Sequence, residues 1–232
     1  YGVEMNMVDD HPHIVSRPTT DLLDDLTYVI FDLETTGLSA QYDHIIEFGA
    51  IKVKNQEIIE EYLTFIKPPV AISSFISSKT NISNQDVANA PVIEEKLDSI
   101  LTFIQGCVLV AHNAQFDNRI LTTEFDRLGY NFDKQTLCTV ELAKQLMPDM
   151  ASYSLGKLVQ ALGIPITNRH RAGGDALATV ELFKLLLLKD AKKEMVQQHI
   201  KTNHWNIPKV DNSVQEELFL HLDSQLRIAE YS

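Results

Sequence analysis

One apolar segment near the start of the chain carries two acidic side chains at its end. Residues 28–33 consist almost entirely of apolar side chains on both faces, which is typical of a strand buried at the centre of a sheet. Asp32 and Glu34 are two positions apart, so on a strand both carboxylates leave the same face. Carboxylates buried side by side repel each other strongly unless a cation neutralises them. This strand therefore predicts either a solvated sheet edge or a cation site, and its apolar faces favour the cation site.

Three further polar side chains lie in two later motifs. Asp117 ends the segment 111–117, and His170 and Asp175 enclose the segment 171–174. Taken singly, Asp117 would usually be a solvated helix-face acid and His170 an ordinary loop residue. Four acids together form an oxygen-rich set that suits Mg²⁺ or Mn²⁺, and these ions act on phosphate esters. The combination predicts a nuclease that uses two divalent metal ions (Mg²⁺ or Mn²⁺).

Composition limits the classes of protein that fit. The chain has 232 residues, 44% of them apolar, which is enough for one sizeable α/β domain with extensions. No apolar run approaches the ~18 residues that span a bilayer, so we expect no membrane partner. Cys107 and Cys138 are too few for a disulfide framework, which favours the reducing cytoplasm. The start at Tyr1 suggests a piece of a longer chain without a secretory signal.

The net charge of −12 disfavours tight, sequence-independent binding to duplex nucleic acid. Residues 27–188 hold nineteen acids and thirteen bases, a net charge of −6. Four of these acids are the proposed metal ligands, and two divalent ions would offset their charge. An enzyme that holds the end of a strand through metals remains compatible with this balance.

Periodicity and turn residues predict a mixed central β-sheet flanked by helices, because three strands come first and strands alternating with helices follow. We interpret residues 27–193 as the main domain, residues 1–26 as an irregular acidic arm and residues 194–232 as a helical C-terminal extension. The predicted strands are 28–33, 45–53, 58–66, 108–111 and 136–139, and the predicted helices are 81–87, 91–104, 113–128, one ending near 148, 155–162 and 175–193.

The C-terminal extension contains a helical pattern of its own. Apolar residues recur every four positions at Val214, Leu218, Leu222 and Leu226. Such a stripe usually packs on its own domain, and the alternative is a docking helix for a partner or a neighbouring domain. The sequence leaves both interpretations open.

The three motifs resemble those of the DnaQ-like family of 3′→5′ exonucleases, in the branch named DEDDh after its four acids and one histidine. All five positions match, namely Asp32, Glu34, Asp117, His170 and Asp175. Four residues separate the histidine from the last acid, as in this branch, whereas the sister branch has a tyrosine with three intervening residues. The resemblance covers roughly residues 27–190 and implies an α/β, ribonuclease H-like fold.

A narrower resemblance is to the proofreading exonucleases of bacterial DNA polymerase III. Residues 1–4 and 8–10 are similar to the sequence before the exonuclease insert of PolC-type polymerases, and residues 152–158 and 168–175 are more similar to separate epsilon-type proteins. The resemblance implies a DNA 3′ end, single-stranded or frayed, as substrate and a replicative DNA polymerase as partner, in cis or in trans. Processing of RNA 3′ ends is an alternative, because DNA and RNA differ here chiefly in the 2′-hydroxyl and nothing in the sequence shows whether the protein contacts that group. A catalytically silent binding module is a further alternative, although all five positions are present.

The resemblance also implies a role for each motif residue. Asp32 would bridge two metals ~4 Å apart, and Glu34 and Asp175 would complete the site of the attacking water. Asp117 would hold the second metal. His170 would take the proton from the water, since histidine exchanges protons near neutral pH. The product would be a nucleoside 5′-monophosphate.

A second set of residues is expected to bind the terminal nucleotide, and of these Thr35, Gly37 and Leu38 match positions that contact it in relatives. Leu38 would wedge against the base, and Asn113 and Phe116 would line the pocket, although Leu38 and Phe116 could equally belong to the core. Around the histidine, the pair 173–174 predicts a flexible loop. Arg169 and Arg171 could meet phosphate, although exposed arginines are usually only solvated.

Overall fold

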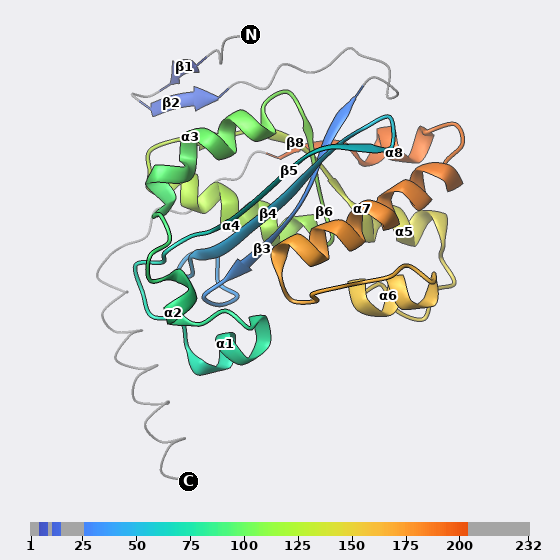
Figure 1. Ribbon diagram of the computed structural model, residues 1–232. Coiled ribbons are helices and arrows are strands. Elements are labelled where there is room, and N and C mark those ends of the chain that lie inside the picture. Colours follow the sequence, from blue (N-terminus) through green and yellow to red (C-terminus); the bar gives the residue numbers. More distant parts are fainter. Residues whose placement is uncertain (1–4, 9–10, 15–25, 204–232) are drawn as a thin grey trace.

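The computed structural model describes residues 5–8, 11–14 and 26–203. Six strands form one mixed sheet in the order β5-β4-β3-β6-β8-β9 (Figure 1). Their bounds are β3 Thr27–Thr35, β4 Ile45–Lys54, β5 Glu57–Phe65, β6 Val108–Ala111, β8 Lys134–Cys138 and β9 Lys201–Asn203. Neighbours β3, β4 and β5 are antiparallel, β6 and β8 continue the sheet in parallel with β3, and β9 returns antiparallel to β8.

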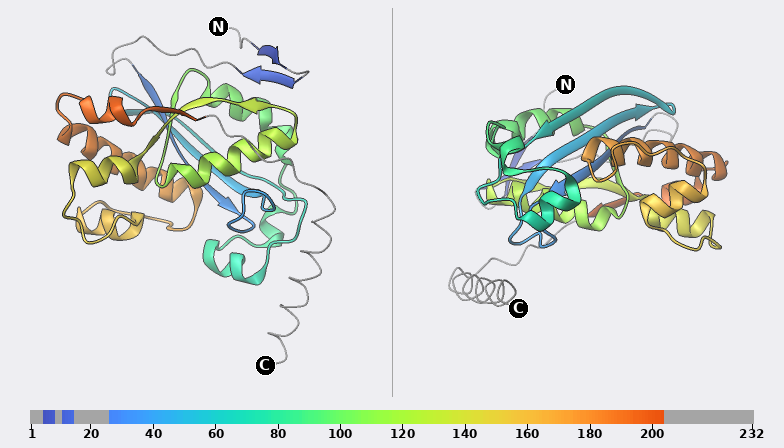
Figure 2. Two further views of the ribbon diagram at one scale, coloured as in Figure 1. Left: turned by 180° about the vertical axis from the view of Figure 1, so that it is seen from behind. Right: turned by 60° about the horizontal axis from the view of Figure 1, so that its bottom comes forward.

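Helices cover both faces of this sheet. Their bounds are α1 Ser74–Thr80, α2 Asn84–Val87, α3 Ile93–Ile104, α4 Ala114–Arg127, α5 Thr139–Leu146, α6 Leu155–Ala161, α7 Ala172–Lys189 and α8 Glu194–His199. In Figure 1 α7 crosses in front of the sheet, and the view from behind in Figure 2 brings α4 forward. The mixed sheet flanked by helices that the sequence predicts is therefore confirmed. Within the described part of the chain, no helix combines the length and the apolar character needed to cross a membrane.

Strand β3 lies at the centre because its two faces feed two different cores. Val29, Phe31 and Leu33 pack with α3 and α4 in one buried cluster. Tyr28 and Ile30 pack with α5, α6 and α7 in the other. Since successive side chains of a strand alternate between faces, the even-numbered positions that follow them belong to the α7 face. This parity directs the acidic end of β3 toward α7.

The start of α7 approaches the sheet very closely at Gly49 of β4. A Cβ atom on Gly49 would collide with the backbone of Ala172 and Gly173. Gly49 is also the residue that pairs with Asp32 in the β3–β4 ladder. The absence of a side chain at this one position allows the first turn of α7 to lie directly beside the acidic end of β3.

Several local predictions differ from the structure. Helix α7 begins at Ala172, three residues before its predicted start, and ends at Lys189. Helix α3 begins at Ile93 with Val92 as its N-cap, so Pro91 lies outside the helix. Helix α1 was not predicted at all. Asn55 and Gln56 form the turn between β4 and β5, and both have the left-handed conformation that tight hairpins require.

The two chain ends are described only in part. Strands β1 (Met5–Val8) and β2 (His11–Ile14) pair with each other, and β2 also pairs with β7 (Asn131–Phe132), so this part of the arm is not irregular. At the other end, α8 and β9 fall inside the predicted extension. The apolar stripe at positions 214–226 lies outside the described residues.

The two adjacent glycines at the start of α7 should respond oppositely to alanine. Gly174→Ala should destabilise the protein by about 1–3 kcal/mol, because its Cβ would collide with the carbonyl oxygens of Thr167 and Asn168. Gly173→Ala should be neutral or stabilising by up to about 1 kcal/mol, since alanine favours helix and the nearest atom, on exposed Leu63, is 3.4 Å away. Thermal or urea unfolding measures both, and equal effects would contradict the packing described.

Candidate active site

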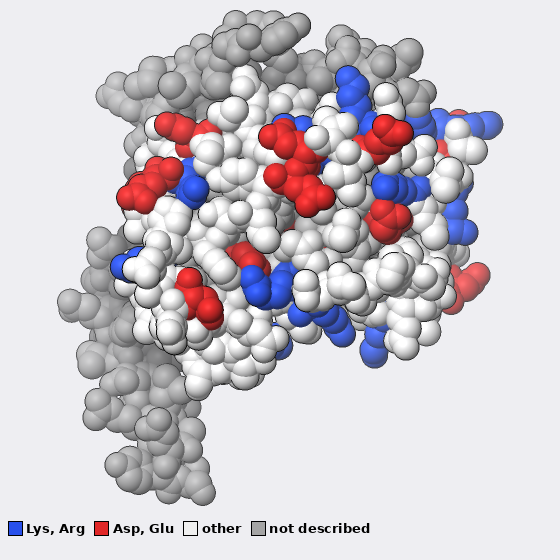
Figure 3. Space-filling model, in the orientation of Figure 1, with Lys and Arg blue, Asp and Glu red and all other residues white. Residues whose placement is uncertain are grey.

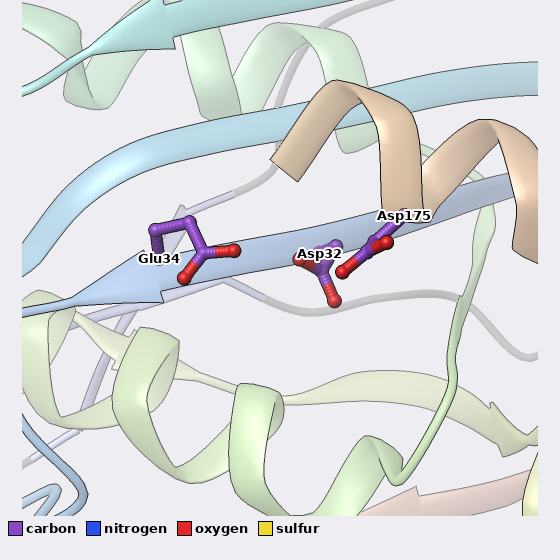
Figure 4. Close-up of side chains that lie close together, drawn as sticks. All are labelled: Asp32, Glu34 and Asp175. Carbon is purple, nitrogen blue, oxygen red and sulfur yellow. The ribbon is translucent and has the colours of Figure 1, made fainter. Parts of the chain in front are cut away.

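Three carboxylates from two elements converge at the end of β3. Asp32, Glu34 and Asp175 each offer one oxygen atom, and these atoms lie within 4.8 Å of one another. Figure 4 shows Asp175 reaching from α7 toward Asp32, with Glu34 farther along the strand. The strand parity and the close approach of α7 described above produce this arrangement. The structure thus brings together three of the four predicted acids as a candidate metal site.

The fourth acid, Asp117, joins the cluster from the first turn of α4. Its side chain is buried, the backbone of Leu33 hydrogen-bonds to its carboxylate, and its charge acts directly on Asp32. The turn into α4 is made by Asn113, which has a φ of 76° and forms no side-chain cap. Asn113 is therefore the N-cap residue of α4, and it forms the turn through its left-handed backbone conformation rather than through a hydrogen bond of its side-chain amide.

Burial and mutual repulsion hold protons on these acids. Burial, followed by repulsion from Asp117 and Asp175, raises the pKa of Asp32 well above its ordinary value. Burial, followed by repulsion from Asp175 and Glu47, raises the pKa of Glu34 to about 8, and burial raises the pKa of Asp117 to about 7. Burial also raises the pKa of Asp175. Without a cation the cluster is therefore partly protonated near neutral pH.

The donor set fits a divalent cation. All four groups offer oxygen atoms, the ligand type that hard divalent ions prefer. The Oδ1 atom of Asp175 is buried and has no hydrogen-bond partner among the described residues, whereas its Oδ2 atom accepts the backbone N–H of His170 at 3.2 Å. A buried carboxylate oxygen without a partner is costly, and a bound cation would satisfy it.

His170 lies at the rim of this cluster. It precedes α7, its side chain is exposed, and its backbone has a φ of 61°, in the left-handed region that non-glycine residues seldom adopt. The backbone hydrogen bond to Asp175 ties it to the acids. The prediction of a flexible loop at residues 173–174 is wrong, because both glycines belong to the first turn of α7.

Arg171 and Glu47 form an ion pair that sequence reasoning missed. Arg171 Nη2 donates to Glu47 Oε1 at 2.6 Å, and this hydrogen bonding raises the pKa of the guanidinium. Arg171 is therefore engaged with a carboxylate, in contrast to the expectation that it meets phosphate. Glu47 is 1% exposed. The signal in the sequence was a single acid inside the otherwise apolar segment 45–51.

The residues predicted to contact a nucleotide surround the same end of β3. The Thr35 hydroxyl donates to the Gly37 carbonyl, and the space beside Gly37 is filled by the carboxylate of Asp43. Leu38 is 79% exposed and so does not belong to the core. Phe116 is half-buried against the α3–α4 core. Glycine at position 37 thus leaves room for the Asp43 carboxylate within the same loop, and the exposed side chain of Leu38 is accessible to a ligand.

Comparison with known proteins assigns the family. The model of the exonuclease family (RNase T) matches residues 29–183. The chain belongs to this family. It is 42% identical over 189 residues to the PolC-type DNA polymerase III of Caldanaerobacter subterraneus subsp. tengcongensis, covering 82% of this chain and 13% of that protein. It is 39% identical over 202 residues to the PolC-type enzyme of Clostridium perfringens, covering 87% and 14%. The chain therefore spans about one-seventh of the length of these curated relatives.

Solved exonuclease structures share the fold. Exonuclease X in complex with 5′ overhanging duplex DNA is 26% identical, with a TM-score of 0.58 and coverage of 72% of this chain and 93% of that chain. E. coli exonuclease I in complex with a dT13 oligonucleotide is 21% identical, with a TM-score of 0.63 and coverage of 72% and 42%. The predicted membership of the DnaQ-like exonucleases and the ribonuclease H-like α/β fold are confirmed, and the domain is a nuclease.

Without metal, the exonuclease domain should lose stability as the pH rises. The folded state keeps protons on Glu34 and Asp117 up to pH values of about 8 and about 7, whereas their ordinary pKa values are 4.5 and 3.8. Between these limits the folded state binds more protons than the unfolded chain, so the free energy of unfolding falls as the pH rises. A saturating divalent cation should remove most of this decline by displacing the protons.

Thermal melts across this pH window, in EDTA and in Mn²⁺, measure the effect. Glu34→Gln should flatten the metal-free curve because it removes a titrating group. A melting temperature that rises with pH in EDTA, or that Mn²⁺ leaves unchanged, would contradict the assignment of the cluster.

Proposed function

We propose that this domain removes nucleoside 5′-monophosphates from single-stranded or frayed DNA 3′ ends, as the proofreading exonuclease of a DNA polymerase III. The observation that carries the proposal is the convergence of Asp32, Glu34 and Asp175 within 4.8 Å, with buried Asp117 beside them. Family membership supports the nuclease chemistry, and the PolC-type relatives support the replicative context. In that context the polymerase lies in the same polypeptide and the domain works in the cytoplasm.

The four acids are proposed to hold two divalent ions, Mg²⁺ or Mn²⁺. These ions would supply the activation of a water and the stabilisation of charge on the leaving 3′ oxygen. His170 is proposed to take the proton of the attacking water at a ring nitrogen. Two observations support this role. The side chain of His170 is exposed, so a ring nitrogen can reach a water, and its backbone N–H donates to Asp175 Oδ2, which places the residue beside the acids.

Thr35, Gly37, Leu38, Asn113 and Phe116 are proposed to contact the terminal nucleotide. An exposed leucine on the loop after β3 supports a wedge against the last base. Contacts of this kind hardly distinguish one base from another. The choice of which 3′ ends are cleaved therefore depends on how easily the terminal nucleotide separates from the duplex. Fraying costs on the order of a few kcal/mol and least at a mismatch, which favours removal of wrongly paired termini.

The surface charge supports binding at a strand end rather than along a duplex. Figure 3 shows acidic side chains gathered over the face that bears β5, where Glu57, Glu60 and Glu61 are exposed. Such a face repels the phosphate backbone. This face therefore disfavours binding along a duplex, which is consistent with a strand end held at the proposed metal site.

A 5′-labelled single-stranded DNA, incubated with the protein in Mn²⁺ or in EDTA, tests the proposal. We expect a ladder that shortens from the 3′ end in Mn²⁺ only, with an RNA of equal sequence cut more slowly. An RNA rate equal to or above the DNA rate would favour RNA processing instead. Failure of the folded protein to cut either strand would favour a silent binding module.

Variants of the same assay test the residues. Asp32→Ala and Asp175→Ala should abolish cleavage, because each removes a proposed ligand, and the exposed control Asp98→Ala should cleave normally. His170→Ala should lower turnover by ~10²–10⁴, the usual contribution of a general base. Wild-type rates in Asp32→Ala would refute the site, and an unchanged rate in His170→Ala would refute the base.

A further inference from the structure

The ion pair between buried Glu47 and partly exposed Arg171 joins the sheet to the start of α7. The Glu47 carboxylate accepts Arg171 Nε at 3.1 Å to each oxygen and Arg171 Nη2 at 2.6 Å. It also accepts the backbone N–H of Ala172 at 2.7 Å, one of the N–H groups that the helix itself leaves unpaired. The Arg171 guanidinium lies over the Phe65 ring, 5.1 Å from its centroid. One carboxylate thus fixes both the N-cap side chain and the first residue of α7.

These contacts lead directly to the two motif residues on either side. The Arg171 carbonyl accepts the backbone N–H of Asp175 at 3.0 Å. Asp175 Oδ2 in turn accepts the backbone N–H of His170, whose φ of 61° is an unfavourable conformation that needs support from its surroundings. Glu47 itself pairs with Glu34 across the β3–β4 ladder, so the ion pair lies beside the carboxylate cluster.

Stability alone is a poor reason for this ion pair. Burying the Glu47 charge is costly, and its attraction to Arg171 is weakened by solvent because the arginine side chain is 33% exposed, so the pair adds little net stability. The contacts of Glu47 instead reach two successive residues, the side chain of Arg171 and the backbone N–H of Ala172, where α7 begins. A carboxylate that fixes the backbone at this place is better explained by geometry than by stability.

We propose that Glu47 and Arg171 are positioning residues that hold His170 and Asp175 against Asp32. This inference rests on the proposed function for its catalytic consequence. Without the ion pair, the backbone at the start of α7 is no longer held against β4. The His170 imidazole then shifts from the position it needs for catalysis, and in Glu47→Gln the Arg171 guanidinium is left without its partner beside the metal ligands. Displacements of ~1 Å at a catalytic group can lower turnover ~100-fold.

Glu47→Gln tests the proposal against Glu61→Gln, an exposed glutamate from the same sheet that does not contact α7 in any described hydrogen bond. At saturating Mn²⁺, turnover on single-stranded DNA should fall ~10- to 100-fold in Glu47→Gln and stay unchanged in Glu61→Gln. In a His170→Ala background, Glu47→Gln should cost less than it does in the wild type, because the part of its effect that passes through the imidazole is already lost and only the part through Asp175 remains. Equal turnover in the two glutamine variants, or an equal loss in both backgrounds, overturns the proposal.

Mn²⁺ binding gives a readout that does not depend on cleavage. The rise in melting temperature with Mn²⁺ should be smaller in Glu47→Gln than in Glu61→Gln, because freed Arg171 competes for the ligand carboxylates. An equal rise overturns the role assigned at Asp175. Because this readout needs no activity, a wild-type protein that binds Mn²⁺ but cleaves nothing would refute the proposed function while still testing the ion pair.

Arg171→Lys keeps the proposal testable if Glu47→Gln fails to fold. Lysine retains the charge but loses the planar fork that bonds both carboxylate oxygens. Turnover should fall while the melting temperature stays within a few degrees, and Arg119→Lys, at an exposed arginine of α4, should behave as wild type. Equal turnover in Arg171→Lys and Arg119→Lys overturns the proposal.

Discussion

Repulsion among four carboxylates, of which Asp117 is buried and the other three are partly buried, is the constraint on which the rest of this structure depends. Asp32 and Glu34 leave β3 on one face, and Asp117 and Asp175 reach the same place from two helices. Burial and neighbouring charge raise their pKa values, so protons hold the metal-free cluster together. A bound divalent ion would replace those protons with two positive charges. The apolar β3, with a core on each side, is what keeps the acids from spreading into solvent.

The fold meets this constraint by packing the start of α7 directly on the sheet. Gly49 leaves room for the backbone of α7, and Glu47 bonds to its first residue. Both belong to β4, two positions apart, and both pair with acidic residues of β3. The antiparallel neighbour of β3 thus acts as the platform that brings Asp175 to Asp32. The position of Asp117 depends instead on the parallel strand β6, which is followed by the left-handed turn at Asn113 and the first turn of α4.

Sequence reasoning located β3 and the five motif residues because strand parity and motif spacing are local properties. It missed α1, whose segment Ser74–Thr80 buries only two side chains and so carries little helical periodicity. It placed the start of α7 too late, because two successive glycines predict a loop, whereas contacts with Thr167 and Asn168 favour glycine at position 174 within the helix. The Glu47–Arg171 pair joins residues 124 positions apart and could be found only from the fold.

Calorimetry of Mn²⁺ binding at neutral pH, in two buffers of different ionisation enthalpy, tests the central claim most directly. Carboxyls with pKa values of about 8 and about 7 must release protons when a cation binds. The heat should therefore differ between the buffers by the equivalent of ~1 proton or more for each protein molecule. Binding with the same heat in both buffers would show that the acids were already ionised, and would contradict a cluster held together by protons until metal replaces them.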